Sequence, residues 1–145
     1  MSPAISPGDH VLMEKFTLLS RKPRRGDIIV FTTKGIAGLA SVEIWVKRVA
    51  GEPGEHLQLL DSQLYINNVR VTRSNAYGEI ACKLPTLPGP PLITNLIVPS
   101  NSYFVLGDNS MNSSDSRYWG CVPETNILGR IVFCYWPPQR AGAVR

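Results

Sequence analysis

One lysine, Lys47, lies inside an apolar and aromatic run, VEIWVKRVAGEPGE, that spans residues 42–55. β-branched and aromatic residues favour a strand, and the Gly- and Pro-rich end of the run predicts a turn that closes it. Because side chains alternate along a strand, Lys47 shares a face with Trp45 and Val49. Burial there disfavours the ammonium form and lowers the pKa of the lysine, so a neutral amine could accept a proton. The alternative is a lysine that extends its ammonium group to solvent from an edge strand.

A loop dense in Asp, Asn and Ser, GDNSMNSSDSRYWG, occupies residues 107–120. Such side chains hydrogen bond to backbone groups and brace tight turns, so the loop could be purely structural. A calcium loop is disfavoured because Asp108 and Asp115 lack the alternating ligand spacing of such loops. A catalytic interpretation is that the Ser113 hydroxyl hydrogen bonds an amine, while Asp115 and Arg117 form an ion pair that fixes the loop.

Short strands are the elements that would position these residues. β-branched or aromatic runs between turn residues predict strands at residues 11–16, 25–31, 42–49, 56–60, 64–68, 69–72, 103–109 and 130–136. The last of these is expected to be buried. Turns are expected at residues 61–62 and 67–68, and a short helix near residues 123–127. The segment KLPTLPGPP at residues 83–91 predicts a surface connection, because its prolines exclude a central strand and a helix.

The composition favours one mostly β domain over residues 1–145, with mixed antiparallel sheets and few short helices. The chain has 12 Gly and 12 Pro, which favour many strands and turns. We expect residues 57–99 to form a small, more variable β/loop insertion. The net charge of +4 is compatible with an anionic membrane surface. The main basic cluster, residues 21–25, has no aromatic residues among its cations, so no nucleic-acid partner is expected.

No metal site or cofactor is expected from the cysteines and histidines. Cys82, Cys121 and Cys134 form no CxxC pair, and His10 and His56 stand alone in the sequence. One disulfide with an odd thiol, or three reduced cysteines, are both compatible with this spacing. No run of about 18 apolar residues predicts a membrane span in the chain as written, and no cleavable signal segment is visible.

Four segments resemble, in order, the conserved blocks of the type I signal peptidases. These are membrane-bound serine peptidases that remove signal peptides from exported proteins. MSPAISPGDHVLMEKF resembles the block S-M-x-P-T-L-x-x-G-D, which begins at the nucleophilic serine, and RGDIIVF resembles the next block. VKRVAGEPGE resembles K-R-V-x-G-x-P-G-D, which holds the general-base lysine. GDNSMNSSDSRYWGCVPE resembles G-D-N-x-x-x-S-x-D-S-R-x-x-G. The resemblance implies that family's fold, a coiled β-ribbon of mixed antiparallel sheets.

The resemblance also implies roles for individual residues. Lys47 matches the general base of a Ser/Lys dyad, and Ser113 matches the serine that orients it. The supporting residues match a structural ion pair and the turn that positions the site: Asp115, Arg117, Gly107, Asp108 and Asn109. The substrate-binding residues match positions that shape small apolar pockets before the scissile bond: Met1, Ile5, Trp45 and Val46. These pockets imply cleavage after Ala-x-Ala sequences.

The sequence departs from the family pattern at its start. Met1 matches the methionine that directly follows the nucleophilic serine, so that serine would precede it. The family's membrane anchor would also lie upstream, and Ala4 stands where threonine is usual. Ser2 is one residue beyond the methionine, and this shift points it to the opposite face of a strand. We therefore expect a catalytic domain that is N-terminally truncated just after its serine, and a chain that is inactive without that serine.

The implied partners are precursor proteins that bear signal peptides and a membrane surface. The implied location of the full-length protein is the extracytoplasmic face, periplasmic or lumenal, of a plasma or thylakoid membrane. Trp45, Tyr135 and Trp136 could meet the bilayer, although Trp136 could equally pack in the core. The alternative function is a non-catalytic module that binds extended apolar peptides. A self-cleaving repressor-type Ser/Lys peptidase is disfavoured, because neither a DNA-binding helical domain nor an internal cleavage site is visible.

Overall fold

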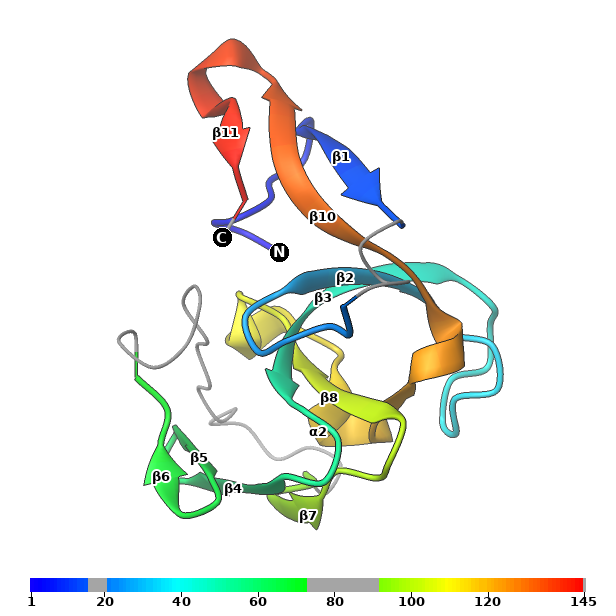
Figure 1. The fold of residues 1–145 in the computed structure, drawn as a ribbon, viewed down its shortest axis with the longest axis vertical. Helices are drawn as coiled ribbons and strands as arrows, with labels where there is room; N and C mark the ends of the chain where they lie inside the picture. Colours follow the sequence, from blue (N-terminus) through cyan, green and yellow to red (C-terminus); the bar gives the residue numbers. More distant parts are fainter. Residues whose placement is uncertain (16–20, 73–91, 145) are drawn as a thin grey trace.

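Strands make up most of the regular structure in the computed structural model (Figure 1), which confirms the predicted mostly β fold class. The structure describes residues 1–15, 21–72 and 92–144. Helical segments within these residues are short: η1 (Ser110–Asn112), α2 (Ser116–Trp119), η2 (Glu124–Asn126) and η3 (Pro138–Arg140). The helix predicted near residues 123–127 is the 3₁₀ turn η2.

The larger sheet has seven strands in the order β1-β10-β2-β3-β8-β9, with β11 paired to β10. These strands are β1 (His10–Glu14), β2 (Ile28–Thr32), β3 (Ile44–Gly51), β8 (Ser102–Leu106), β9 (Val122–Pro123), β10 (Ile127–Trp136) and β11 (Gly142–Ala143). All of their pairings are antiparallel. The far half of β10 rises with β1 and β11 as an arm, and both chain termini lie at its base (Figure 1).

The smaller sheet has four strands in the order β6-β5-β4-β7. They are β4 (His56–Leu60), β5 (Gln63–Ile66), β6 (Val69–Arg70) and β7 (Asn95–Ile97). The two hairpins turn at residues 61–62 and 67–68, where φ is 47° and 61°, then 49° and 66°. Positive φ at both central residues is what tight hairpin turns require, so the two predicted turns are confirmed. Apart from His56, its strands fall in the range 57–99 of the expected insertion. The sheet packs its leucines against Ala50, Phe104 and Leu106.

Strands β2 and β3 bury side chains on both faces of the larger sheet. One face holds Ile29, Phe31 and Val49 in a cluster with Trp119. The other face holds Ile28, Val30 and Ile131. Fully buried strands of this kind read as continuous apolar runs, which explains the sequence IIVF in β2. Successive side chains of β3 point to opposite faces of the sheet, so each enters either the cluster with Trp119 or the cluster with Ile131.

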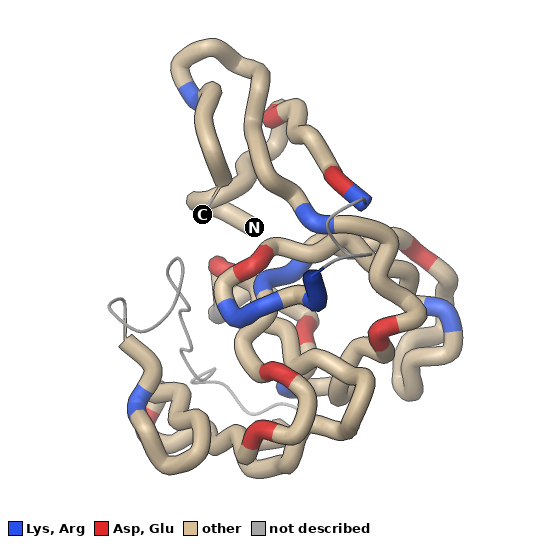
Figure 2. The backbone as a smooth tube through the Cα atoms, viewed as in Figure 1, with Lys and Arg blue, Asp and Glu red and all other residues tan. Residues whose placement is uncertain are grey.

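The strand predicted at residues 130–136 starts earlier and is only partly buried. It begins at Ile127, and its second half exposes Phe133, Tyr135 and Trp136. The prediction of a buried strand was wrong for this second half, because it lies in the arm, where only β1 and β11 pair with it. Charged residues are sparse along β10 and β11 (Figure 2). The predicted surface connection at residues 83–91 lies outside the described residues.

Candidate active site

Lys47 lies in the middle of β3 and is half-buried. It pairs in register with Ile29 of β2, whereas the pairing of β3 with β8 starts at Arg48. Trp45 shares its face, and the Lys47 Nζ atom lies 5.6 Å from the centre of the Trp45 ring. The predicted placement of this lysine beside Trp45 is confirmed.

The Ser113 hydroxyl is the hydrogen-bond partner of this amine. Lys47 Nζ donates to Ser113 Oγ over 3.1 Å, although the two residues are 66 positions apart in the chain. Ser113 follows η1 in an extended conformation, with φ −128° and ψ 122°. Gly107 makes room for it, because a Cβ on Gly107 would lie 2.1 Å from Ser113 Oγ. The loop can therefore bring its serine to the lysine only where residue 107 has no side chain.

Burial lowers the pKa of Lys47 below its ordinary value of 10.5. Desolvation is the largest cause, since the ammonium form loses its water shell. The charges nearby act in both directions: Asp115 raises the pKa, Arg117 lowers it and Asp108 raises it. A lysine with a lowered pKa has a larger neutral fraction near pH 7 and can take a proton from a hydroxyl group.

Asp115 and Arg117 form a fully buried ion pair behind Ser113. Arg117 Nε donates to Asp115 Oδ1 over 2.8 Å, and a terminal guanidinium nitrogen donates to Oδ2 over 2.9 Å. Both side chains have no exposed surface. The Asp115 carboxylate also accepts from the amide nitrogens of Gly107 and Arg117 and caps helix α2. The predicted ion pair is confirmed, and it ties the end of β8 to the serine loop.

Asp108 belongs to a second buried ion pair, which the sequence analysis did not predict. Arg48 donates through Nε and a terminal nitrogen to the two carboxylate oxygens, at 2.7 and 2.8 Å. A further nitrogen of Arg48 donates to the Gly26 carbonyl oxygen over 2.8 Å. Arg48 is adjacent to Lys47 and points to the other face of β3. A buried arginine in such an apolar strand needs a carboxylate partner. That requirement is the feature of the sequence from which an ion pair of Arg48 could have been predicted.

The remaining predicted site residues do not gather at one place. Met1, Ile5 and Val46 pack against the cluster of Ile28, Val30 and Ile131. Trp45 packs on the opposite face of β3, with its ring centre 5.9 Å from that of Trp119. Asn109 is exposed, and its carbonyl oxygen accepts from the Asn112 amide at the start of η1. The four residues expected to shape substrate pockets thus divide between two faces of the sheet.

Other possible sites are not supported by the part of the chain that the structure describes. It holds no group of three or more His, Cys, Asp or Glu side chains arranged to bind a metal ion. Cys121 and Cys134 are free thiols, and Cys82 lies outside the described residues. None of the helices in the described ranges has the length and apolar character to cross a membrane.

Sequence comparison identifies the family. The family model described as signal peptidase, peptidase S26, matches residues 1–136. Signal peptidase I of Leptolyngbya laminosa is 36% identical over 98% of this chain and 67% of its own length. Thylakoidal processing peptidase 1 of Arabidopsis thaliana, a chloroplastic protein, is 32% identical over 97% of this chain and 40% of its own length. The chain thus spans well under half of the Arabidopsis relative.

Structure comparison agrees with this assignment. The crystal structure of a signal peptidase I from Enterococcus faecalis superposes with a TM-score of 0.54 at 28% sequence identity. The superposition covers 76% of this chain and 97% of the other. The antiparallel sheets described above are therefore the fold of that enzyme, as the sequence blocks implied.

Proposed function

The chain belongs to the signal peptidase family, peptidase S26, and on this premise we propose that it is the catalytic domain of a serine endopeptidase that removes signal peptides from exported precursors. The observation that carries the proposal is the half-buried Lys47 amine, which donates to Ser113 Oγ over 3.1 Å. Its lowered pKa suits a general base. The proposed nucleophile is a serine that would directly precede Met1.

The proposed mechanism uses Lys47 for every proton transfer. Ser113 accepts one N–H of the neutral amine and so leaves the nitrogen lone pair directed to the nucleophile. Lys47 takes the serine proton as the serine oxygen bonds to the scissile carbonyl carbon. When the C–N bond breaks, the same proton passes to the leaving amine. Water then attacks the acyl-enzyme, gives its proton to Lys47, and the serine hydroxyl is restored as the acid leaves.

The substrate is proposed to lie along the edge of β3 that pairs with no described strand at residues 44–47, which we call the free edge. Residues 44–47 pair with β2 on one side, whereas β8 pairs only from Arg48 onward. An extended peptide could add main-chain hydrogen bonds to the other side of this segment. The Met1, Ile5 and Val46 side chains lie together on one face near that edge and would favour small apolar residues, as in Ala-x-Ala sites.

A chain extended at Met1 tests the mechanism. The extension carries the N-terminal segment of the Leptolyngbya relative and ends in serine. We expect this protein to cleave a precursor with an Ala-x-Ala site, and Lys47→Met to lower kcat/KM by about 10²–10⁴-fold, the usual contribution of a general base. Lys34→Met, which removes an exposed lysine, is the matched control and should leave the rate unchanged.

Unchanged activity of Lys47→Met would contradict the proposal. Lys47-dependent cleavage by the unextended chain would transfer the nucleophile's role to Ser2 or Ser6.

A non-catalytic module for extended apolar peptides is the second candidate, because the free edge of β3 suits binding without cleavage. The extended chain discriminates between the two functions. A binding module would retain an Ala-x-Ala peptide with micromolar or tighter affinity and release it uncut, whatever residue precedes Met1. Mass spectrometry of the peptide after incubation distinguishes these outcomes.

We also propose that the full-length protein works at the extracytoplasmic face of a membrane. The side chains of Tyr135 and Trp136 are 56% and 52% exposed, so the core interpretation of Trp136 is wrong. Such side chains suit the boundary of a bilayer. Trp45 is not part of this surface, since it packs against Trp119. Flotation of the purified chain with anionic liposomes tests the proposal, and Tyr135→Ser/Trp136→Ser should reduce the floated fraction. Absence of flotation at low salt would count against it.

A further inference from the structure

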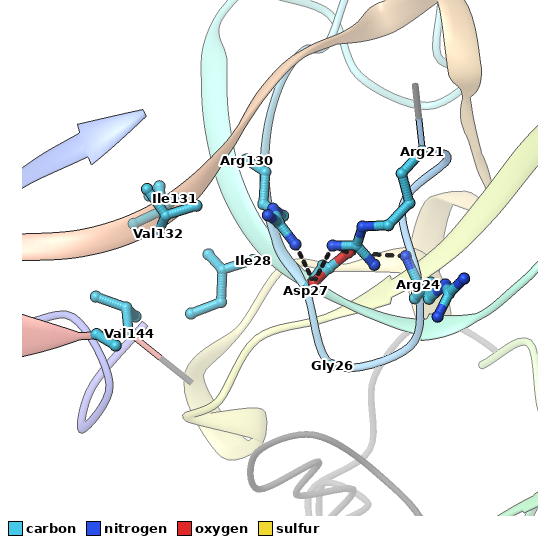
Figure 3. A pocket seen from close by; sticks show the side chains of 10 residues that line it. Arg21, Arg24, Gly26, Asp27, Ile28, Arg130, Ile131, Val132 and Val144 are labelled. Atoms are coloured by element: carbon cyan, nitrogen blue, oxygen red, sulfur yellow. Dashed lines mark hydrogen bonds and ion pairs between the residues drawn. The ribbon is translucent and has the colours of Figure 1, made fainter. Parts of the chain in front are cut away.

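A cavity of about 420 Å³ lies where β2 begins, at the base of the arm (Figure 3), and neither Lys47 nor Ser113 is among its lining residues. Its walls come from the turn that precedes β2, from β10 and from the segment around β11. Three arginines, Arg21, Arg24 and Arg130, and a single carboxylate, Asp27, line it. Its size falls in the range of small-molecule sites, roughly 300–1,000 Å³. The proposed peptidase mechanism does not use these residues.

The carboxylate of this cavity is already neutralised by its neighbours. Asp27 accepts from Arg21 over 3.1 Å, from Arg130 over 3.2 Å and from the Arg24 amide over 2.9 Å. Arg130 turns its other nitrogens to Glu14, so it is satisfied by two carboxylates. One guanidinium charge thus remains in excess among the residues described here.

The excess charge comes with unused hydrogen-bond donors. Arg21 reaches Asp27 with one terminal nitrogen, which leaves its Nε and its other terminal nitrogen without a partner among the described residues. The Arg24 side chain has no partner there either, and its guanidinium points away from Asp27 in Figure 3. A guanidinium presents five N–H donors in a planar fork that matches phosphate oxygens. These two side chains can therefore receive an anion without breaking an ion pair of the fold.

The opposite end of the cavity is apolar. Ile28, Val132 and Val144 line it and lie apart from the arginines (Figure 3). A free inorganic anion would use only the arginine end. A ligand with an anionic head and a hydrocarbon chain would use both ends, because the chain gains from burial against these side chains.

We propose that this cavity binds the phosphate headgroup of an anionic phospholipid, with the start of an acyl chain against Val132 and Val144. The location favours a lipid over a soluble anion. The same arm exposes Leu12, Phe133, Tyr135 and Trp136. Strand β10, which lines the cavity, thus also carries exposed aromatic side chains of the kind that suit a lipid boundary. The inference concerns a regulatory or docking ligand and does not depend on which residue serves as nucleophile.

Monomeric dihexanoyl-phosphatidylglycerol is the probe, titrated into the intact chain by calorimetry and followed by NMR of the arginine Nε–H groups. We expect saturable binding of one lipid per chain, with shifts at Arg21 and Arg24. Dihexanoyl-phosphatidylcholine, which has the same chains and no net charge, should bind at least about tenfold more weakly. Inorganic phosphate should also bind at least about tenfold more weakly, because it lacks the apolar part.

Two variants and one matched control complete the test. Arg24→Gln should weaken phosphatidylglycerol binding about tenfold, the effect of losing one charge-assisted hydrogen bond. The Arg24 side chain has no hydrogen-bond partner among the residues that the structure describes, so this change breaks no contact given there. Val144→Asn should weaken lipid binding while leaving the weak phosphate binding unchanged. Lys34→Gln removes an equal charge outside the cavity and should have no effect.

Several results would overturn the proposal. They are no saturable phosphatidylglycerol binding, equal binding of phosphatidylcholine, or lipid binding that Arg24→Gln and Lys34→Gln weaken alike. Phosphate binding as tight as lipid binding would mean a simple anion site. Since the readout is binding, failure here leaves the proposed peptidase function standing, and loss of peptidase activity in Lys47→Met would not affect the lipid titration.

Discussion

Gly107 has no side chain because the Ser113 hydroxyl occupies the space where one would lie. A methyl group there would be 2.1 Å from Ser113 Oγ, 2.7 Å from Ser113 Cβ and 3.6 Å from Lys47 Nζ. We expect Gly107→Ala to displace Ser113, to break its hydrogen bond with Lys47, and to lower the free energy of unfolding by about 1–3 kcal/mol, as overpacking does. Urea denaturation measures the stability, and NMR of the Lys47 side chain reports the lost contact.

A double variant separates the steric effect from the lost hydrogen bond. Ser113→Gly removes both atoms that the new methyl group would meet, so Gly107→Ala/Ser113→Gly should recover most of the lost stability. It should not recover peptidase activity in the extended chain, because Lys47 then lacks its hydroxyl partner. Stability of the double variant that is no better than that of Gly107→Ala would contradict the steric argument.

Lys47 makes the stability of the fold depend on pH in a defined direction. Because desolvation lowers its pKa in the folded chain below 10.5, the unfolded chain binds more protons between the two pKa values. The free energy of unfolding contributed by this group therefore rises with pH across that window and levels off above 10.5. We expect the difference in stability, wild type minus Lys47→Met, to increase between neutral pH and about pH 10.

Urea titrations at a series of pH values measure this difference. The Cys121 thiol, whose pKa burial raises to about 11, is present in both proteins and cancels in the subtraction. Lys34→Met, an exposed site, is the control and should give a flat difference. A flat or falling difference for Lys47→Met would mean that the amine is charged in the fold, which would contradict its assignment as a general base.

Local patterns in the sequence predicted most strands, because strand side chains alternate and turn residues mark the ends. The hairpins at residues 61–62 and 67–68 are the clearest cases, since Asp, Ser and Asn tolerate the positive φ that the turns need. The short elements β7, β9, β11 and α2 were missed. Strands of two or three residues carry no periodicity, and their pairing with β4, β8 or β10 depends on tertiary contacts.

The candidate site was predicted by its residue types and by family resemblance, but part of its support was not. Lys47, Ser113, Asp115 and Arg117 meet as expected. The Arg48–Asp108 pair was missed because its two members are 60 positions apart, and no local rule pairs residues at that separation. Trp45 and Val46 were predicted to shape the same substrate pockets because both match such positions in the family. Neighbouring side chains of a strand point to opposite faces, so the two lie on different sides of the sheet.

The element η3 holds the N-terminal segment in place through one side chain. Arg140 Nε donates to the Asp9 carboxylate over 2.8 Å, and a terminal nitrogen donates to the carbonyl oxygens of Pro3 and Ala4, at 2.9 and 3.4 Å. This arginine lies outside the residues that the family model matches, 1–136. We infer that it positions the segment which follows the proposed nucleophile.

Arg140→Met should loosen that segment without unfolding the protein. The amides of Ile5, bonded to Met1, and of Ser6, bonded to Asp9, should exchange with deuterium about tenfold faster, while amides of β2 keep their protection. Lys22→Met, which breaks an exposed pair with Glu124, is the control and should change neither. Equal acceleration in β2 would indicate global destabilisation, and no acceleration at Ile5 would remove the positioning role.

Two buried guanidinium–carboxylate pairs brace the whole molecule around Lys47. Arg48–Asp108 joins β3 to the end of β8, and Arg117–Asp115 joins that end to α2. The two carboxylates flank Gly107, so both pairs fix the backbone that positions Ser113. Burying four charges costs solvation, and the cost is offset only while each charge keeps its partner. A domain of this size has about 5–15 kcal/mol of net stability, so loss of one partner should lower the free energy of unfolding of the whole domain.

Arg48→Met tests this view. It leaves Asp108 buried without its guanidinium, and we expect the free energy of unfolding to fall by about 3–5 kcal/mol, measured by urea denaturation. Arg48→Met/Asp108→Leu removes both charges and should fall by less than the single variant, because no unpaired charge remains. The surface variant Arg24→Met removes an exposed arginine whose side chain has no partner within residues 1–15, 21–72 and 92–144, and it should change stability by less than about 0.5 kcal/mol. If the double variant were less stable than Arg48→Met, the two side chains would stabilise the fold mainly by packing. The argument that an unpaired buried charge destabilises the structure around Lys47 would then fail.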